Sequence, residues 1–278
     1  MNKIFSRSTF RNCFDNGYDK TYSQVVRRYV DNGTGKQNSE LISQIYNVLR
    51  EDYRNEYYYK NTLLNKLLLG IHSVNTTTAL TEIPIAKSKA DFVLINGKAV
   101  VYEIKTELDN FDRLENQIND YYKAFDHVAV VTCKENLQVL KKKIEMIGKP
   151  VGIYILQKRG TITTIQKPQA YSVELDAEIL FKILRKQEYE EILFNKYKHL
   201  PDVSEFKYYS ECKKMFLEIP LEEAYLSVLK LLKKRSQIIK DEFSKIPYEL
   251  KFLAYFMNLK SDDYKKITKF LNESYGGV

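Results

Sequence analysis

Three charged residues near the middle of the chain, Asp91, Glu103 and Lys105, have the types and spacing needed to hold a divalent cation and a phosphate. In a strand, side chains two residues apart share a face at about 7 Å, so Glu103 and Lys105 project together. Charges on a sheet face need a partner or an ion. Mg²⁺, or Mn²⁺ in its place, prefers carboxylates, water and phosphate oxygens, and a lysine beside it can orient or deprotonate water or hold a phosphate.

The elements that must bring these residues together are two strands joined at residues 96–98 (Asn-Gly-Lys), which predict a β-hairpin. A strict two-residue turn would pair Asp91 with Tyr102 and place Asp91 and Glu103 on opposite faces. We therefore expect an odd loop or a bulge. Gly97 can adopt the left-handed conformation that a three-residue loop requires.

A helix is predicted after the second strand, with Asp109 as its N-cap. Gln117 and Tyr121 are one helical turn apart and share a face of this helix. Apolar residues recur beside them at helical spacing and predict a buried stripe: Phe111, Leu114, Ile118, Tyr122 and Phe125.

The pattern of Asp91 followed by Glu103-Ile104-Lys105 after a hairpin resembles the PD-(D/E)XK nuclease superfamily, with Ala90 in place of the motif's proline. The resemblance implies an α/β fold with a restriction-endonuclease-like αβββαβ core and a mixed sheet. It also implies that Asp91 and Glu103 bind Mg²⁺ or Mn²⁺ and that Lys105 assists the attack of water on a phosphodiester.

The Q-x-x-x-Y pattern of Gln117 and Tyr121 resembles the branch of that superfamily that includes RecB-type nucleases and lambda exonuclease. By this resemblance the two residues help to position DNA or the active-site strand. The implied function is a metal-dependent deoxyribonuclease that serves defence, repair or mobile elements. The alternative is a non-cleaving module of the same fold that binds nucleic acid or a protein partner in a regulatory role.

An additional acidic ligand is expected from the helix before the sheet or from the first strand. Glu56 is the candidate on the helix, although an ion pair with Lys60 one turn later explains it equally well. Glu82 is the rival on the first strand. Lys87 and Lys89 precede Asp91 on the loop entering the site, where they are placed to hold a DNA backbone.

The E-x-K spacing alone carries little information, because it occurs four times, beginning at Glu103, Glu205, Glu211 and Glu249. Only the first of these ends a β-branched strand after an acid-bearing hairpin strand and before a Q-x-x-x-Y helix. The competing interpretation is that Asp91, Glu103 and Lys105 form a surface charge cluster on a half-exposed sheet.

Apolar periodicity divides the chain into three parts: a helical N-terminal arm over 1–35, the nuclease-like domain over 36–170 and a helical C-terminal domain over 171–278. In the middle part, strands are predicted over 76–85, 127–133, 151–156 and 161–165. A helix is predicted over 134–147.

Composition limits the function classes. The 278 residues include 44 basic and 36 acidic side chains, a net charge of +8 that favours a polyanionic partner, DNA by the resemblance. Three distant cysteines make no disulfide framework or four-cysteine cluster. No apolar run is long enough for a membrane span and no secretory signal is present, so we expect a cytoplasmic protein. A protein partner or a second copy would bind through the C-terminal helices.

Overall fold

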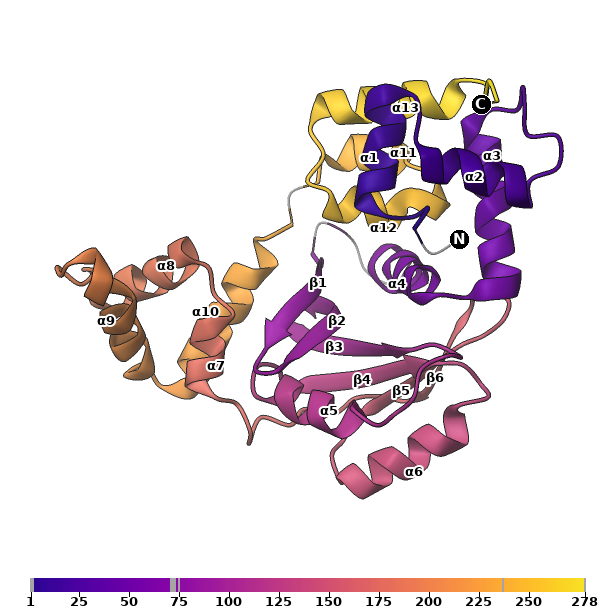
Figure 1. Cartoon of the computed structure of the whole chain (residues 1–278). Coiled ribbons are helices and arrows are strands. Elements are labelled where there is room, and N and C mark those ends of the chain that lie inside the picture. Colours follow the sequence, from indigo (N-terminus) through magenta and orange to yellow (C-terminus); the bar gives the residue numbers. More distant parts are fainter. Residues whose placement is uncertain (1–2, 71–73, 75, 237, 278) are drawn as a thin grey trace. The chain divides into compact units, whose positions relative to one another are not determined.

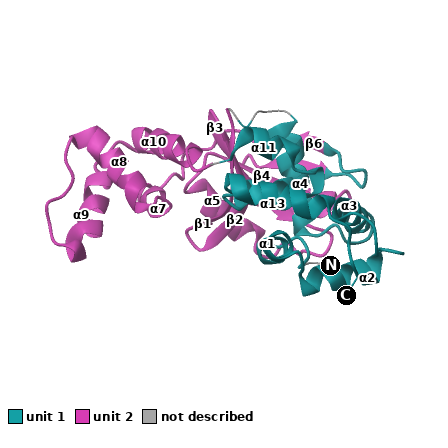
Figure 2. Cartoon of the chain, turned by 90° about the horizontal axis from the view of Figure 1, so that it is seen from above, with its two compact units in different colours: residues 1–74, 156–162, 237–278 teal, residues 75–155, 163–236 magenta. Residues whose placement is uncertain are grey.

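The structure is a computed structural model that describes residues 3–70, 74, 76–236 and 238–277. It is a mixed α/β protein with a six-stranded sheet and many helices, which confirms the predicted class. The chain forms two compact units (Figure 2). Unit 1 contains residues 1–74, 156–162 and 237–278, and unit 2 contains residues 75–155 and 163–236. The three-part division predicted from the sequence, with boundaries after residues 35 and 170, groups the chain differently from these two units and stays a prediction.

The strands of the sheet are β1 (Thr78–Ile85), β2 (Ser88–Asn96), β3 (Lys98–Lys105), β4 (His127–Thr132), β5 (Gly152–Leu156) and β6 (Ile162–Gln166), and they lie in this order across it. The β1–β2 and β2–β3 pairs are antiparallel, whereas the β3–β4 and β4–β5 pairs are parallel. A parallel pair requires a crossover connection. Along the chain, helix α5 (Leu114–Tyr122) connects β3 to β4, and α6 (Leu137–Ile147) connects β4 to β5 (Figure 1).

The hairpin between β2 and β3 has the odd loop that the sequence predicts. Asn96 pairs with Lys98 and only Gly97, at φ 72°, lies between them. The register continues to Phe92 opposite Tyr102, so the next position places Asp91 opposite Glu103. The two acids therefore share one face of the sheet.

One face of the sheet carries the core of unit 2. Val93 on β2, Val101 on β3 and Val130 on β4 are fully buried there with apolar residues of α5 and α6. The stripe predicted for the helix after β3 is buried at all five positions, Phe111, Leu114, Ile118, Tyr122 and Phe125, which confirms its burial. Phe111 precedes α5 and Phe125 follows it, so only the other three lie on the helix itself. Alternation along β3 places Glu103 and Lys105 on this same helix-covered face.

Helix α5 begins at Leu114, so the prediction of Asp109 as its N-cap is wrong. The Asp109 carboxylate instead accepts hydrogen bonds from the backbone N–H of Thr106 (2.8 Å) and from its hydroxyl (2.7 Å). An aspartate that could cap a helix can also close a local turn, and here the turn holds the end of β3.

Four further helices belong to unit 2: α7 (Ala177–Lys182), α8 (Lys186–Tyr197), α9 (Glu205–Leu217) and α10 (Leu221–Lys233). Their apolar residues join the core of the sheet. The Tyr225 hydroxyl of α10 donates to the Asp126 carboxylate (2.6 Å) just before β4, and Thr78 Oγ1 of β1 donates to the Lys233 carbonyl (2.6 Å). The helical character predicted after residue 171 is confirmed. Of these four helices α10 packs against β2, whereas α7 and α8 pack on α10 and α9 packs on α7 and α8.

Unit 1 is helical. Its elements are α1 (Arg7–Asn16), α2 (Lys20–Tyr29), α3 (Asn38–Val48), η1 (Leu49–Tyr53), α4 (Glu56–Leu63), η2 (Leu64–Leu69), α11 (Lys240–Lys245), η3 (Tyr248–Leu250), α12 (Lys251–Phe256) and α13 (Ser261–Asn272). The two ends of the chain pack together, with Arg11 of α1 3.1 Å from Asp263 of α13 (Figure 1). Among the described residues, no helix has the length and apolarity required to cross a bilayer.

Candidate active site

Asp91 is held against β3 by its own side chain. The backbone N–H of Ile104, which lies between Glu103 and Lys105, donates to Asp91 Oδ2 at 2.9 Å. Behind it, Thr81 Oγ1 of β1 donates to the Asp91 carbonyl at 2.7 Å. The carboxylate is thus fixed beside the E-x-K segment of the neighbouring strand.

Glu103 is buried and receives hydrogen bonds on both carboxylate oxygens. Its side chain is only 3% exposed. Gln117 Nε2 donates to Oε1 at 2.6 Å, and the Tyr121 hydroxyl donates to Oε2 at 2.5 Å. Both donors come from α5 and are the two residues of the Q-x-x-x-Y pattern, which were expected to position DNA or the active-site strand; here they contact Glu103 of β3.

Lys105 is buried beside Glu103. Its Nζ lies 3.0 Å from Glu103 Oε1 and donates to Gln117 Oε1 at 2.8 Å. The Gln117 amide therefore bridges the two charged groups, as donor to one and acceptor from the other. Because removing a partner from such a buried pair leaves an uncompensated charge, the three side chains hold one another in this arrangement.

Tyr121 acts as a neutral hydrogen-bond donor. Burial, followed by the negative charge of Glu103, raises the pKa of Tyr121 far above its ordinary value of 10.0. The hydroxyl therefore keeps its proton at neutral pH. Besides Glu103, it also lies 3.0 Å from the Lys89 carbonyl of β2, so it ties α5 to both hairpin strands.

Glu82 lies next to Asp91 across the β1–β2 pair. The flanking pairs of Thr81 with Phe92 and Ile83 with Ala90 put the two acids opposite one another. Their carboxylate oxygens are within 4.8 Å. Glu82 has φ 58°, a left-handed conformation that costs a residue with a side chain about 1 kcal/mol or more. It forms an ion pair with Lys89.

Glu56, the other predicted candidate for the additional acid, is the first residue of α4 in unit 1. Its carboxylate is 2.5 Å from Lys60 Nζ one turn later, which is the helical ion pair that the sequence offered as the alternative. The Lys60 side chain is buried, whereas that of Glu56 is 58% exposed. A role for Glu56 as a metal ligand stays a prediction.

The side chains on this face offer the type of donor atom that a hard divalent cation prefers. Glu82, Asp91 and Glu103 occupy adjacent positions on three neighbouring strands and offer only carboxylate oxygens, the ligand type that Mg²⁺ and Mn²⁺ prefer. Each carboxylate oxygen has two acceptor directions, so Glu103 can keep its present hydrogen bonds and still offer a lone pair. With Lys105 at 3.0 Å from Glu103, the cluster combines anionic ligands with one cationic group.

A cleft of about 1010 Å³ lies beside this cluster, between the β1–β2 turn and α5, and Gln117 is part of its wall. Sequence reasoning identified Lys87 and Lys89 there but missed Asp120, which organises the turn. The Asp120 carboxylate accepts from the Ser88 hydroxyl at 2.8 Å and from Lys123 Nζ at 2.9 Å. No sequence signal marks Asp120, because its partners are defined by tertiary packing.

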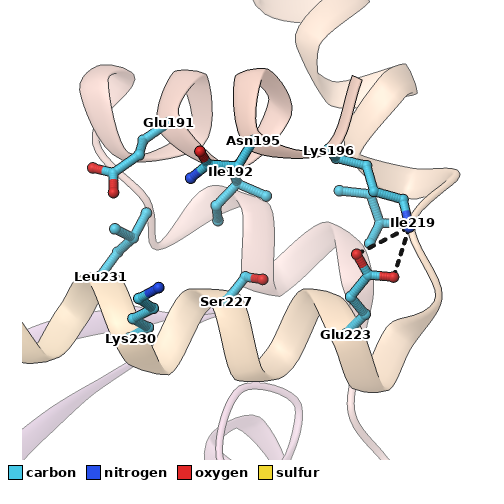
Figure 3. A pocket seen from close by; sticks show the side chains of 9 residues that line it. All are labelled: Glu191, Ile192, Asn195, Lys196, Ile219, Glu223, Ser227, Lys230 and Leu231. Atoms are coloured by element: carbon cyan, nitrogen blue, oxygen red, sulfur yellow. Dashed lines mark hydrogen bonds and ion pairs between the residues drawn. The ribbon is translucent and has the colours of Figure 1, made fainter. Parts of the chain in front are cut away.

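A second hollow, of about 340 Å³, lies between α8 and α10. Figure 3 shows Lys196 of α8 and Glu223 of α10 meeting across it, with Nζ to carboxylate distances of 3.0 and 2.7 Å. Its other acid, Glu191, pairs with Lys234 at 2.7 Å. Both acids of this hollow thus form ion pairs with lysines, Lys196 and Lys234.

Fold and site together define a mixed α/β protein whose sheet carries clustered carboxylates and a buried lysine beneath a helix. The family model described as Bacteriophage P4 protein cII matches residues 49–252, the larger part of the chain, and the chain belongs to this family. Protein cII of Enterobacteria phage P4 is 24% identical over 143 residues, which are 50% of this chain and 49% of that protein. The chain thus spans about half the length of this curated relative. No solved structure matches the chain.

Proposed function

We propose that the chain is a metal-dependent nuclease that hydrolyses the phosphodiester bonds of DNA on a restriction-endonuclease-like core. The order α4, β1, β2, β3, α5, β4 agrees with the αβββαβ arrangement expected of that core. The observation that carries the proposal is the placement of Asp91 opposite Glu103, with Lys105 on the same face and both E-x-K side chains bonded to Gln117.

In this proposal Asp91 and Glu103 hold Mg²⁺ or Mn²⁺, and Glu82 is the additional carboxylate because it neighbours Asp91 on the sheet. A bound cation would supply Lewis-acid stabilisation of the charge that develops on the phosphate. The chain's own part is to fix the carboxylates. The Ile104 N–H orients Asp91, and Tyr121 and Gln117 orient Glu103, so little reorganisation is needed when a substrate binds.

Lys105 has the second role. Its ammonium group lies within hydrogen-bonding distance of Glu103 and Gln117, which fix its position at the end of β3. From there it orients the attacking water or holds an oxygen of the scissile phosphate. Loss of such a positioned group typically slows hydrolysis by about 10² to 10⁴-fold.

The test is cleavage of plasmid DNA and of single-stranded DNA by the purified protein with Mg²⁺, with Mn²⁺ and with EDTA. We expect cleavage with either cation, none with EDTA, and a loss of about 10² to 10⁴-fold for Lys105→Ala. Lys207→Ala is the matched control, because Lys207 also ends an E-x-K sequence but lies on the exposed face of α9.

Cleavage that survives Lys105→Ala, or that Lys207→Ala reduces equally, would show that the E-x-K strand is not the catalytic centre. Binding of DNA without cleavage under any of these conditions would identify instead a non-cleaving module of the same fold. The same assay on RNA of matched sequence determines which nucleic acid is the substrate.

A further inference from the structure

The cleft beside the carboxylate cluster has a wall that suits a polyanion. It is formed entirely within unit 2. Its lining comes from the β1–β2 turn and from the first and last turns of α5 and the residues next to them: Pro84, Ala86, Lys87, Ser88, Lys89, Arg113, Asn116, Gln117, Asn119, Asp120 and Lys123. Four of these side chains are basic and one is acidic.

The acidic side chain does not cancel the positive charge of the cleft. Asp120 accepts hydrogen bonds from the backbone N–H of Lys87 at 3.2 Å, from Ser88 and from Lys123. It therefore stabilises the turn and pairs with only one of the four cationic side chains. Lys89 is paired with Glu82. Lys87 and Arg113 are exposed, and the described part of the chain offers their side chains no hydrogen bond or ion pair.

The remaining lining indicates contact with backbone groups of a nucleic acid. Asn116, Gln117 and Asn119 offer amide groups suited to phosphate and sugar oxygens. None of the lining residues is aromatic, so the cleft lacks the stacking surface that binds unpaired bases. Arg113 and Asn116 also lie at the N-terminal end of α5, where the helix dipole favours an anion.

The cleft is continuous with the candidate active site through one side chain. Gln117 lines the cleft and is also bonded to Glu103 and Lys105. A strand lying in the cleft would therefore pass directly beside the carboxylates and the lysine.

We propose that this cleft binds the sugar-phosphate backbone of a DNA strand next to the position of cleavage, with Lys87 and Arg113 as its free phosphate-binding cations. The proposal rests on the proposed function for its choice of DNA. The contact is independent of base sequence and sensitive to salt, since each phosphate neutralised releases counterions.

The test is equilibrium binding of fluorescently labelled DNA, single-stranded and duplex, to the full chain in EDTA over a series of salt concentrations. For the double variant Lys87→Ala/Arg113→Ala we expect the slope of log affinity against log salt to fall by about 1.4 to 1.8. At about 0.1 M salt this corresponds to roughly 25- to 60-fold weaker binding. The matched control is Lys141→Ala/Lys142→Ala, which removes the same charge from the exposed face of α6.

The proposal is supported if the cleft variant lowers the slope and the affinity for several DNA sequences alike while the α6 variant leaves both unchanged. It is overturned if the cleft variant binds like the wild type, if the α6 variant loses as much, or if the loss depends on base sequence. Both cleft side chains are exposed, so an unchanged melting temperature will show that the fold is intact. Because binding is measured without a metal, failure of cleavage and failure of the cleft are separate results.

Discussion

Removal of the Tyr121 hydroxyl tests whether α5 holds the buried glutamate in place. Tyr121→Phe deletes only one oxygen, the donor to Glu103 Oε2 at 2.5 Å. Hydrogen bonds to charged groups contribute about 1.5 to 3 kcal/mol. The Glu103 side chain is 3% exposed and Tyr121 is fully buried, so water does not readily replace the lost donor. We expect the free energy of unfolding to fall by about 2 to 3 kcal/mol.

Tyr122→Phe is the matched control. Tyr122 is the next residue of α5 and equally buried, but its hydroxyl has no hydrogen-bond partner among the described residues. Deleting a buried hydroxyl that lacks a partner removes a desolvated polar group and leaves shape nearly unchanged. Its free energy of unfolding should therefore stay the same or rise by up to about 1 kcal/mol.

The assay is urea unfolding at neutral pH followed by circular dichroism, with equal slopes required for the two variants and the wild type so that midpoints report stability. A Tyr121→Phe protein as stable as the wild type would refute the reasoning, as would equal losses for both tyrosine variants. Either result would mean that the short contact to Glu103 does not position the carboxylate.

Two further results are expected. Burial opposes ionisation of Asp120, but hydrogen bonds from Lys123 and Ser88 outweigh it and hold the pKa of Asp120 below its ordinary value of 3.8. Asp120→Asn should therefore lower the free energy of unfolding by about 1 to 2 kcal/mol at neutral pH. Urea unfolding at several pH values should show this difference shrink as the pH falls below about 4. An equal difference at all pH values would contradict this origin. In calorimetric titration with Mn²⁺, Glu82→Gln should weaken binding more than Glu56→Gln does, and the reverse order would assign the additional ligand to Glu56.

The hairpin register could be predicted from the sequence because side chains alternate between the two faces of a strand, and few registers place both acids on the same face. Asp91 and Glu103 can share a face only if an odd number of residues separates the paired ends, and Gly97 provides the conformation for it. The resemblance implied that Gln117 and Tyr121 position DNA or the active-site strand, whereas their contact with Glu103 comes from the structure. The helical spacing explains why both reach the same carboxylate.

Other features depend on contacts between distant segments, and local patterns do not encode them. Asp109 is as suitable for a local turn as for a helix cap, and only the structure distinguishes the two. The cleft joins residues 84–89 to residues 113–123, and the left-handed Glu82 lies in a segment that reads as an ordinary strand. The packing of α1 against α13 likewise joins the two ends of the chain.

The most direct measurement of the central claim is an anomalous difference map from crystals soaked in Mn²⁺. The account predicts a peak within coordination distance, roughly 2.0 to 2.3 Å, of carboxylate oxygens of both Asp91 and Glu103, with Lys105 beside it. A fully soaked crystal with no peak there, or with manganese bound only at other acids, would contradict the assignment of these residues as a metal-dependent centre.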